Sequence, residues 1–246
     1  MEIEVLEKRA KKLRRDILDI AFNRGKGHIG GAFSIIEILV SLYDKVMTED
    51  DKFILSKGHA CLPLYVILKE RGFNPKISGH PEIDVENGIH CTTGSLGHGL
   101  PIGVGMALAR KLKRKKGNIY VLMSDAECQE GTTWESLLLA AHYKLDNLVV
   151  IVDHNNMQTL GKTSEILSLG EIGKKFEVFG CDVSRIDGHS FDELIEELSR
   201  KVYGKPRAII ANTIKGKGVS YMEDVPKWHT MVPNEMELKH AYRELE

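Results

Sequence analysis

The sequence predicts an α/β protein with a doubly wound, mostly parallel sheet and helices on both faces. Apolar runs of strand length alternate with longer segments in which apolar residues recur at helical spacing. The clearest unit is an apolar run at 119–123, a helical segment at 132–144 and a second apolar run at 148–153. Strand, helix and strand in that order make a βαβ unit, whose parallel strands are buried on both faces.

The residues before this unit are expected to be mainly helical. Residues 3–22 have apolar side chains at helical spacing, and glycines then interrupt the chain around His28. A mostly apolar helix is expected at 34–46, with Ser34 as its possible N-cap. The elements expected next are a strand at 52–55, a helix at 61–71, a glycine-rich loop at 73–97 and a helix at 99–116.

The residues after the unit continue the alternation. A strand at 182–186, a helix at 190–202 and a buried strand at 206–211 are expected. The chain from residue 216 is expected to be irregular until a final short helix at 235–245. Neither an internal repeat nor a low-complexity linker divides the sequence, so we expect a single domain over residues 1–246.

Composition and charge narrow the class of protein. The 246 residues are 42% hydrophobic and 28% charged, and the formal net charge is -1, so no broad attraction to nucleic acid or to an anionic membrane is expected. The longest aliphatic run, Leu148–Val152, is too short to span a bilayer, and the N-terminus lacks the apolar core of a signal peptide. The four cysteines have no C-x-x-C spacing, which argues against a zinc knuckle or a disulfide framework and favours a reducing cytoplasm. A basic run at 110–116 lacks an aromatic platform, and cations complement the C-terminal end of a helix, so we do not interpret it as a nucleic-acid site.

Two polar side chains follow the two strands of the βαβ unit, Asp125 after the first and Asn155 after the second. Ligands of parallel α/β sheets bind beyond the carboxyl ends of the strands, and neighbouring strands lie about 4.8 Å apart, so both oxygens can converge on one ion. A carboxylate, an amide and a backbone carbonyl suit Mg²⁺, and the helix beginning near Thr132 would aim its N-terminus at the same edge. The alternative is that both residues merely cap loops, as Asp and Asn commonly do.

The segment that contains both residues resembles the thiamine-diphosphate motif of the transketolase family. It reads SDAECQEGTTWESLLLAAHYKLDNLVVIVDHNNMQTLG. The matching positions between its two ends are Gln129, Glu130, Gly131, Trp134, Glu135, Leu145, Asn147 and Leu148. The resemblance implies that Asp125 and Asn155 are side-chain ligands of Mg²⁺, or of Ca²⁺ or Mn²⁺ in its place, and that Met157 supplies a backbone carbonyl. It also places Glu130 at a subunit interface near the cofactor, as a catalytic and cofactor-binding residue.

The sequence departs from the family at the start of this motif, where Gly-Asp-Gly is replaced by Ser124-Asp125-Ala126. The family's second glycine lets the backbone approach the diphosphate closely. Ala126 can donate the same N–H group if its φ is negative, at the cost of a methyl group. We therefore expect Ala126 to contact the cofactor with altered local geometry, while the retained Asp and Asn preserve the metal site.

Further motifs of the family surround four histidines. His28 lies in KGHIGGAFS, His59 in LSKGHA, His80 in GHPE and His229 in KWHT. The resemblance implies that His28, His80 and His229 contact the substrate or the reactive intermediate. It places His59 and His229 near the diphosphate. An isolated histidine is more often structural than catalytic, but three of these are each embedded in a family-like tetrapeptide.

Two more segments are implied to contact the cofactor. TTGSLGHGLPIGVGMALA resembles the family's glycine loop and the helix that follows it, which places Gly94, Ser95 and Leu96 along the cofactor. The role of His98 in this loop stays open. Lys215, in TIKGKG, either reaches the diphosphate, as in related deoxyxylulose-phosphate synthases, or is a solvated loop charge.

The resemblance implies a thiamine-diphosphate-binding fold and a transketolase reaction, in which a two-carbon ketol unit passes from a ketose, expected to be phosphorylated, to an aldose. Histidines suit the proton transfers of this reaction. The family uses a glutamate of a separate pyrimidine-binding domain, and this chain ends at Glu246, soon after the diphosphate-binding domain would be complete. We therefore expect a split enzyme that is active only with a C-terminal transketolase-like partner chain, in a 2+2 heterotetramer.

Three alternatives stay open. One is another thiamine-diphosphate reaction, deoxyxylulose-phosphate synthesis or oxo-acid decarboxylation, although the histidine set favours sugar transfer. A second is a cofactor-free scaffold or degenerate subunit, which Ser124 and Ala126 support. The third is a dinucleotide-binding Rossmann domain, which is weak because residues 94–99 read G-x-x-G-x-G instead of G-x-G-x-x-G.

Overall fold

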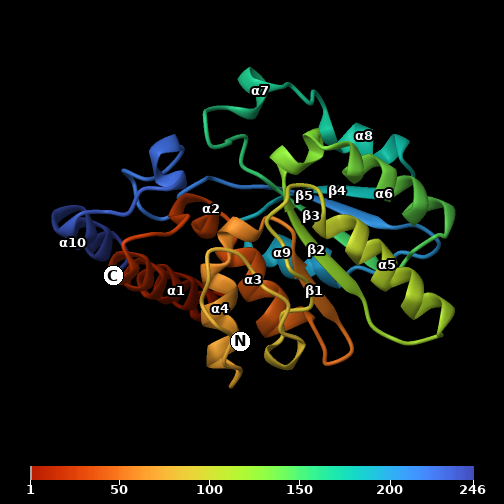
Figure 1. Cartoon of the computed structure of the whole chain (residues 1–246), viewed down its shortest axis with the longest axis horizontal. Helices are drawn as coiled ribbons and strands as arrows, with labels where there is room; N and C mark the ends of the chain where they lie inside the picture. The colour runs from red at the N-terminus through yellow and green to blue at the C-terminus, as the bar shows by residue number, and fades with distance from the viewer. Residues whose placement is uncertain (1) are drawn as a thin grey trace.

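A computed structural model describes residues 2–246 of the chain. Its five-stranded sheet has the order β1-β2-β3-β5-β4, and every pair of neighbouring strands is parallel (Figure 1). The strands are β1 (Lys52–Leu55), β2 (Ile119–Ser124), β3 (Leu148–His154), β4 (Asp182–Asp187) and β5 (Arg207–Asn212). The predicted parallel α/β sheet is confirmed, and each strand lies where the alternation of the sequence placed it.

Helices cover both faces of the sheet, as predicted (Figure 1). The helices on one face are α1 (Ile3–Arg24), α3 (Ile36–Ser41), α4 (Leu62–Glu70) and α9 (Phe191–Ser199), and those on the other are α5 (Gly99–Leu112), α6 (Gly131–His142) and α8 (Ile172–Val178). Successive side chains of a strand point to opposite faces, so the core divides into two clusters. In β2, Tyr120 and Leu122 pack with the α1 side, whereas Val121 and Met123 pack with the α5 side.

The predicted βαβ unit is formed by β2, α6 and β3. Ile119 pairs with Leu148 at its start, and Ser124 pairs with Asp153 at its end. β5 lies between β3 and β4, so the chain crosses over β5's position when it passes from β3 to β4. Because all five strands run in one direction, their carboxyl ends share one edge of the sheet.

The segment after the first helix differs from the prediction. The glycines near residue 30 do not break the chain, because Ile29–Phe33 form the short helix α2. Ser34 does not cap the next helix, which begins at Ile36. Its hydroxyl donates to the Asp153 carboxylate instead, so the residue serves a long-range contact. α3 continues into a π-helical turn at Leu42–Val46.

Several boundaries also differ from the prediction. α5 ends at Leu112 instead of residue 116, and Arg114 adopts a left-handed φ of 51°. The short helix α7 (Thr163–Ile166) and the helix α8 were not expected. The 3-10 turns are Gly58–Ala60, Val85–Asn87, Asp125–Gln129 and Pro226–His229. The final helix α10 (Glu235–Glu244) begins with a capping box in which Asn234 is the N-cap.

All four cysteines are free and buried. Burial raises the pKa of Cys61 and of Cys181 to about 12, and it raises the pKa of Cys91 and Cys128 as well. Among residues 2–246, none of the helices combines the length and the apolar character needed to traverse a bilayer.

Candidate active site

The loops that follow the strands meet at the carboxyl edge of the sheet, around a cavity of about 100 Å³. The loop after β1 supplies Lys57 and His59, the loop after β3 supplies Asn155, and the loop after β5 supplies Lys215. His229, from the 3-10 turn near the C-terminus, completes the wall. The parallel sheet thus brings together residues that are far apart in the sequence.

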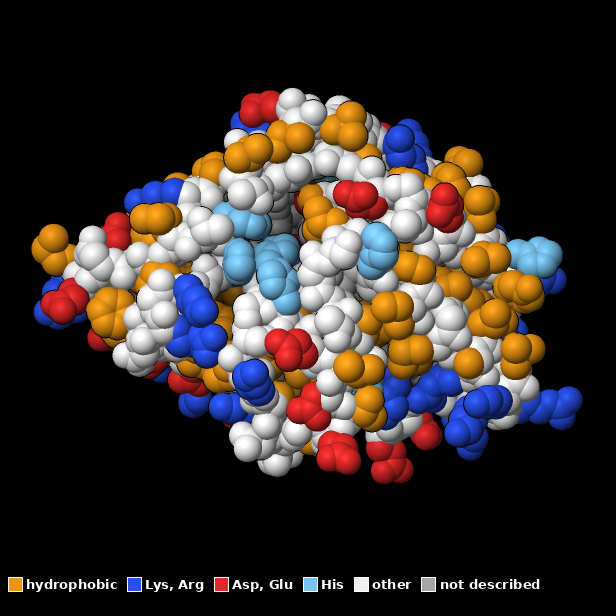
Figure 2. Space-filling view, in the orientation of Figure 1, with side chains coloured by type: hydrophobic (Ala, Val, Ile, Leu, Met, Phe, Trp, Pro, Cys, Tyr) orange, Lys and Arg blue, Asp and Glu red, His pale blue; other side chains and the backbone are white. Residues whose placement is uncertain are grey.

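Four histidines form a cluster beside this cavity. The ring centre of His28 lies 5.5 Å from that of His59, 6.0 Å from that of His80 and 5.3 Å from that of His229. The rings of His59 and His229 are 5.1 Å apart. Figure 2 shows histidine side chains gathered around a hollow on this face of the molecule. The structure therefore brings all four histidines named from the sequence into one place.

Three histidines of the cluster, His28, His59 and His229, are held in their uncharged form. Burial lowers the pKa of His28, places that of His59 well below its usual value and lowers that of His229 to about 4. Repulsion from neighbouring imidazoles and from nearby lysines, including Lys215, adds to the effect. A neutral imidazole has one lone pair and one N–H, so it can accept a proton or hydrogen bond from one group and donate to another.

Asp125 is buried just beyond the end of β2. Its Oδ1 accepts a hydrogen bond from the Ala126 N–H at 2.8 Å, and its Oδ2 accepts one from the Asn156 N–H at 2.7 Å. The second bond ties the loop after β2 to the loop after β3. Burial and the nearby Asp153 carboxylate raise the pKa of Asp125 to about 6. A cation beside this carboxylate would offset both effects.

The other predicted metal ligands lie in the loop that Asp125 holds. Asn155 and Met157 both line the cavity. Asn155 Oδ1 accepts a hydrogen bond from the Met157 N–H at 3.0 Å, and Asn155 Nδ2 donates to Asp153 at 2.8 Å, which orients the amide. Within residues 2–246 no three His, Cys, Asp or Glu side chains form a metal cluster. One carboxylate, one amide oxygen and one backbone carbonyl, completed by phosphate and water oxygens, fit Mg²⁺.

A buried carboxylate, Asp153, lies beneath this loop. It accepts hydrogen bonds from Ser34, Thr213 and Asn155 and forms an ion pair with Lys57. Burial alone would raise the pKa of Asp153, but Lys57 and the hydrogen bonds outweigh it and hold that pKa below its usual value. Asp153 was not predicted as a site residue, because three of its partners, Ser34, Lys57 and Thr213, come from separate segments that no local pattern connects.

Ser124, which replaces the first glycine of the family's Gly-Asp-Gly, forms a capping box with Glu127. The Ser124 hydroxyl accepts the Glu127 N–H at 3.4 Å, and Glu127 Oε2 accepts the Ser124 N–H at 2.8 Å. Ala126 lies in the following 3-10 turn and has no positive φ, so its methyl group causes no backbone strain. Its N–H is already donated to Asp125. The S-x-x-E spacing is the signal in the sequence that could have revealed Glu127.

Glu127 also holds the glycine loop before α5. Its Oε1 accepts hydrogen bonds from the Gly97 N–H at 3.1 Å and from the Ser56 hydroxyl. Gly97 has a φ of +74°, and a Cβ at this position would lie 2.7 Å from the Cβ of Glu130. The loop therefore needs glycine here both for its backbone conformation and for its close approach to the loop after β2.

The remaining residues of the predicted site lie at its rim. Gly94, Ser95 and Leu96 are exposed, and Leu96 lines the cavity. His98 Nδ1 lies 2.9 Å from the Leu96 carbonyl oxygen, so His98 closes the loop on itself. The exposed Glu130 carboxylate has no hydrogen bond or ion pair within residues 2–246. Its place at a subunit interface stays a prediction.

Lys215 is buried, which excludes the alternative of a solvated loop charge. Its Nζ donates to the Gln158 carbonyl at 3.0 Å and lies 3.1 Å from His229 Nδ1. Burial and the charge of Lys57 lower the pKa of Lys215 to about 8. Among the described residues no carboxylate forms an ion pair with this amine, so an anionic ligand in the cavity would supply the missing countercharge.

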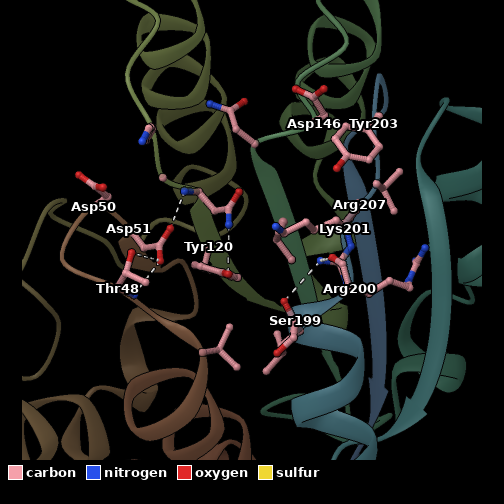
Figure 3. A pocket seen from close by; sticks show the side chains of 18 of the residues that line it. Thr48, Asp50, Asp51, Tyr120, Asp146, Ser199, Arg200, Lys201, Tyr203 and Arg207 are labelled. Atoms are coloured by element: carbon pink, nitrogen blue, oxygen red, sulfur yellow. Dashed lines mark hydrogen bonds between the residues drawn. The ribbon is translucent and has the colours of Figure 1, made fainter.

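A larger cavity, of about 630 Å³, lies at the opposite, amino-terminal edge of the sheet (Figure 3). Its polar side chains are largely engaged in structural bonds. Asp51 accepts hydrogen bonds from Thr48 and from the Asn118 N–H, and Arg207 donates to carbonyl groups at the end of α9. It contains none of the predicted site residues, so volume alone does not locate the site.

The model of a protein family described as the thiamine diphosphate binding domain of transketolase matches residues 6–245. The chain belongs to the transketolase family. The apulose-4-phosphate transketolase subunit of Phocaeicola vulgatus is 39% identical, covering 100% of this chain and 95% of that protein. The 6-deoxy-6-sulfo-D-fructose transketolase subunit of a Clostridium species is 37% identical, covering 98% of this chain and 96% of that protein.

Solved transketolases share the fold. The enzyme from Campylobacter jejuni superposes with a TM-score of 0.88 at 30% identity, over 100% of this chain and 43% of its own. The enzyme from Leishmania mexicana gives 0.86 at 25% identity, over 98% of this chain and 41% of its own. The chain thus spans less than half of these transketolases, and the predicted thiamine-diphosphate-binding fold is confirmed.

Proposed function

We propose that this chain is the diphosphate-binding subunit of a two-chain transketolase. It would transfer a two-carbon ketol unit from a phosphorylated ketose to an aldose, with thiamine diphosphate and Mg²⁺. The observation that carries the proposal is the bond between Asp125 and the loop of Asn155 and Met157, at the edge where four histidines and the buried Lys215 gather. The full-length similarity to relatives named as transketolase subunits supports it.

The metal and the diphosphate would be held by the loops at the carboxyl edge. Asp125, Asn155 and the Met157 carbonyl provide hard oxygen ligands for Mg²⁺. Lys215 and His59 face the same cavity as donors to the phosphate oxygens. The cofactor, when bound, supplies a ring that accepts the electrons released as a carbon–carbon bond of the ketose breaks.

The sugar would be bound by the outer members of the histidine cluster, His28, His80 and His229. Their imidazoles can hydrogen-bond to hydroxyl oxygens and move protons at the carbonyl oxygen. The sugars in the names of the two relatives reported above each carry an anionic group, a phosphate in one and a sulfonate in the other. A ketose with an anionic end group is therefore the substrate class that we assign to this chain.

The catalytic partner would be a second chain with a pyrimidine-binding domain, in a 2+2 assembly. Beside the site, α5 and α6 expose an apolar strip, which we define as Ile102, Leu138, Leu139 and Tyr143, with exposures of 43%, 59%, 54% and 44%. Figure 2 shows hydrophobic side chains gathered on this face, next to the hollow with the histidines. A strip of this kind is expected to be covered by another protein surface. The Glu130 carboxylate, at the N-cap position of α6, would face the same partner.

Calorimetry with thiamine diphosphate and Mg²⁺ tests the cofactor site. The wild-type chain is expected to bind the cofactor only when Mg²⁺ is present. Asp125→Ala should weaken this binding by about a hundredfold, because it removes the charged ligand of the ion. Asp50→Ala, which removes an exposed carboxylate at the opposite edge, is the matched control and should bind normally. Equal binding by wild type and Asp125→Ala would refute the site.

A second experiment tests the reaction and the partner. Ketol transfer from a ketose phosphate should require both this chain and a protein with a pyrimidine-binding domain, and mass measurement of the mixture should give two copies of each. Rapid turnover by this chain alone would refute the two-chain proposal.

A further inference from the structure

The loop after β5 carries Lys215 and is held from outside the cofactor site. The residues on either side of Lys215 make contacts with distant segments. The Ile214 N–H donates to His189 Nε2 at 2.9 Å, and the Lys217 carbonyl accepts from Arg14 Nε at 2.6 Å. Both contacts lie on the side of the loop away from the cavity, because neither His189 nor Arg14 lines it.

The bond from Ile214 fixes the tautomer of His189. Since Nε2 accepts a hydrogen bond from a backbone N–H, it carries no proton, and Nδ1 must carry the proton of the neutral ring. His189 Nδ1 lies 3.0 Å from Glu37 Oε2, so it donates to that carboxylate. Glu37 in α3 thus orients the imidazole that holds the loop.

Arg14 contacts both Glu37 and the same loop. Its Nη2 lies 2.8 Å from Glu37 Oε1, while its Nε holds the Lys217 carbonyl, so Arg14, Glu37 and His189 enclose residues 214–217 from both ends. Gly218 has a φ of +93°, and a Cβ there would lie 2.9 Å from Arg14 Nε, so this close approach requires glycine.

The ion pair of Arg14 and Glu37 is buried. Arg14 and Glu37 are 3% and 7% exposed. Burial alone would raise the pKa of Glu37, but Arg14 and His189 hold that pKa below its usual value. Removal of one member of a buried ion pair leaves the other charge without compensation, so the three side chains act together.

We propose that His189, oriented by Glu37 and supported by Arg14, is a positioning residue that holds the Lys215 amine in the cofactor cavity. None of the three side chains touches that cavity, so they act through the backbone of residues 214–217. The inference rests on the proposed function only for the identity of the anion that Lys215 binds. It goes beyond that function because it assigns a role to three residues outside the site.

Competitive acetylation of the purified chain without cofactor, followed by peptide mass spectrometry, measures the pH midpoint at which Lys215 becomes reactive. The exposed Lys113 serves as the internal reference. His189→Leu removes both hydrogen bonds of the imidazole and should move the Lys215 midpoint upward by about one pH unit, because the amine gains contact with water. His189→Gln retains an acceptor for Ile214 and a donor for Glu37, and should restore the wild-type midpoint.

A purely structural role predicts a different result. His189→Leu would then have a lower melting temperature but an unchanged Lys215 midpoint. Alternatively, the Lys215 midpoint of His189→Gln would be shifted as far as that of His189→Leu. Either outcome would overturn the proposal. Should His189→Leu fail to fold, Arg14→Lys decides, because lysine retains the charge beside Glu37 but lacks the Nε donor to Lys217. An unchanged Lys215 midpoint in the folded Arg14→Lys chain would equally overturn it.

Binding of thiamine diphosphate separates this inference from the proposed function. His189→Leu should weaken cofactor binding about tenfold relative to His189→Gln. If the wild-type chain binds no thiamine diphosphate, the proposed function fails, whereas the acetylation midpoints still decide the role of His189.

Discussion

At the scale of single residues, the site is built from side chains whose protonation is set by burial. His28, His59 and His229 all have lowered pKa values, whereas Asp125 has a raised one. In both cases burial disfavours the charged form. The histidines beside the cavity are therefore uncharged near neutral pH, and Asp125 would be stabilised in its charged form by the metal ion that accompanies a diphosphate.

The histidines should make the folded chain sensitive to acid. The unfolded state takes up a proton at His229 near pH 6.5, whereas the folded state does so only near pH 4. Stability is therefore fully present above pH 6.5 and is lost as the pH falls toward 4. Replacing His229 with Asn should reduce the slope of the unfolding free energy against pH in this window by up to about 1.4 kcal/mol per pH unit. Urea unfolding at several pH values measures the slope.

A histidine of the surface provides the control for this experiment. His142 is exposed at the end of α6, so His142→Asn should leave the slope as it is in the wild type. Identical slopes for wild type and His229→Asn would contradict the burial argument.

Single residues could be predicted where a local motif carries them. Asp125 and Asn155 follow apolar runs, and the structure places them in loops that a hydrogen bond joins. The burial of Lys215 could not be predicted, because its surroundings come from segments distant in the sequence. Asp153 and His189 escaped notice for the same reason.

At the scale of elements, α5 shows how glycine spacing adapts a helix to a sheet. Gly103 faces β2, and a Cβ there would lie 2.4 Å from Val121 Cγ2. Gly105, two positions later, is exposed and a Cβ there would meet nothing within 4 Å. The first glycine permits close packing of the helix on the strand, while the second only lowers the helix propensity.

The two glycines should therefore respond oppositely to alanine. Gly103→Ala should destabilise the isolated chain by about 1–3 kcal/mol, because the added methyl group overlaps Val121. Gly105→Ala should stabilise it by up to about 1 kcal/mol, through helix propensity alone. Chemical unfolding of both variants measures the difference, and a change of the same sign in both would show that the packing of α5 on β2 has been misjudged.

The sequence predicted elements best where strands are buried on both faces. β2, β3 and β5 were recognised as buried apolar runs. β4 was also expected, although it mixes polar and apolar residues and is only partly buried. α2 was missed because its glycines are typical of turns, whereas burial against His59 and Lys215 stabilises it as a helix. The end of α5 was placed too late because the basic residues continue the helical pattern beyond the point where packing stops.

At the scale of the whole molecule, an apolar core layer lies on each side of the sheet, and an apolar strip is exposed on the outer surface of α5 and α6. The two core clusters account for the buried faces of the helices. The strip of Ile102, Leu138, Leu139 and Tyr143 is left without cover in the single chain. This asymmetry is consistent with the proposed partner.

A charge in the apolar strip should separate assembly from folding. Leu138→Asp is expected to change the stability of the isolated chain by less than about 0.5 kcal/mol, because the side chain is already 59% exposed. It should weaken binding of the partner at least about tenfold, since an unpaired carboxylate would be buried in the interface. Tyr203→Asp, at the opposite edge, is the control and should bind normally. Sedimentation of the mixed chains measures both, and normal assembly of Leu138→Asp would remove the strip from the interface.

The four buried cysteines can be used to measure local opening of the folded chain, because each reacts only when it becomes exposed. A thiol reacts through its thiolate, and both burial and raised pKa values suppress that form in the folded chain. Cys61 lies next to His28 and His59, in the core cluster on the α1 side of the sheet, whereas Cys181 belongs to the cluster on the α8 side. Their alkylation rates would therefore report local opening on the two sides of the sheet independently.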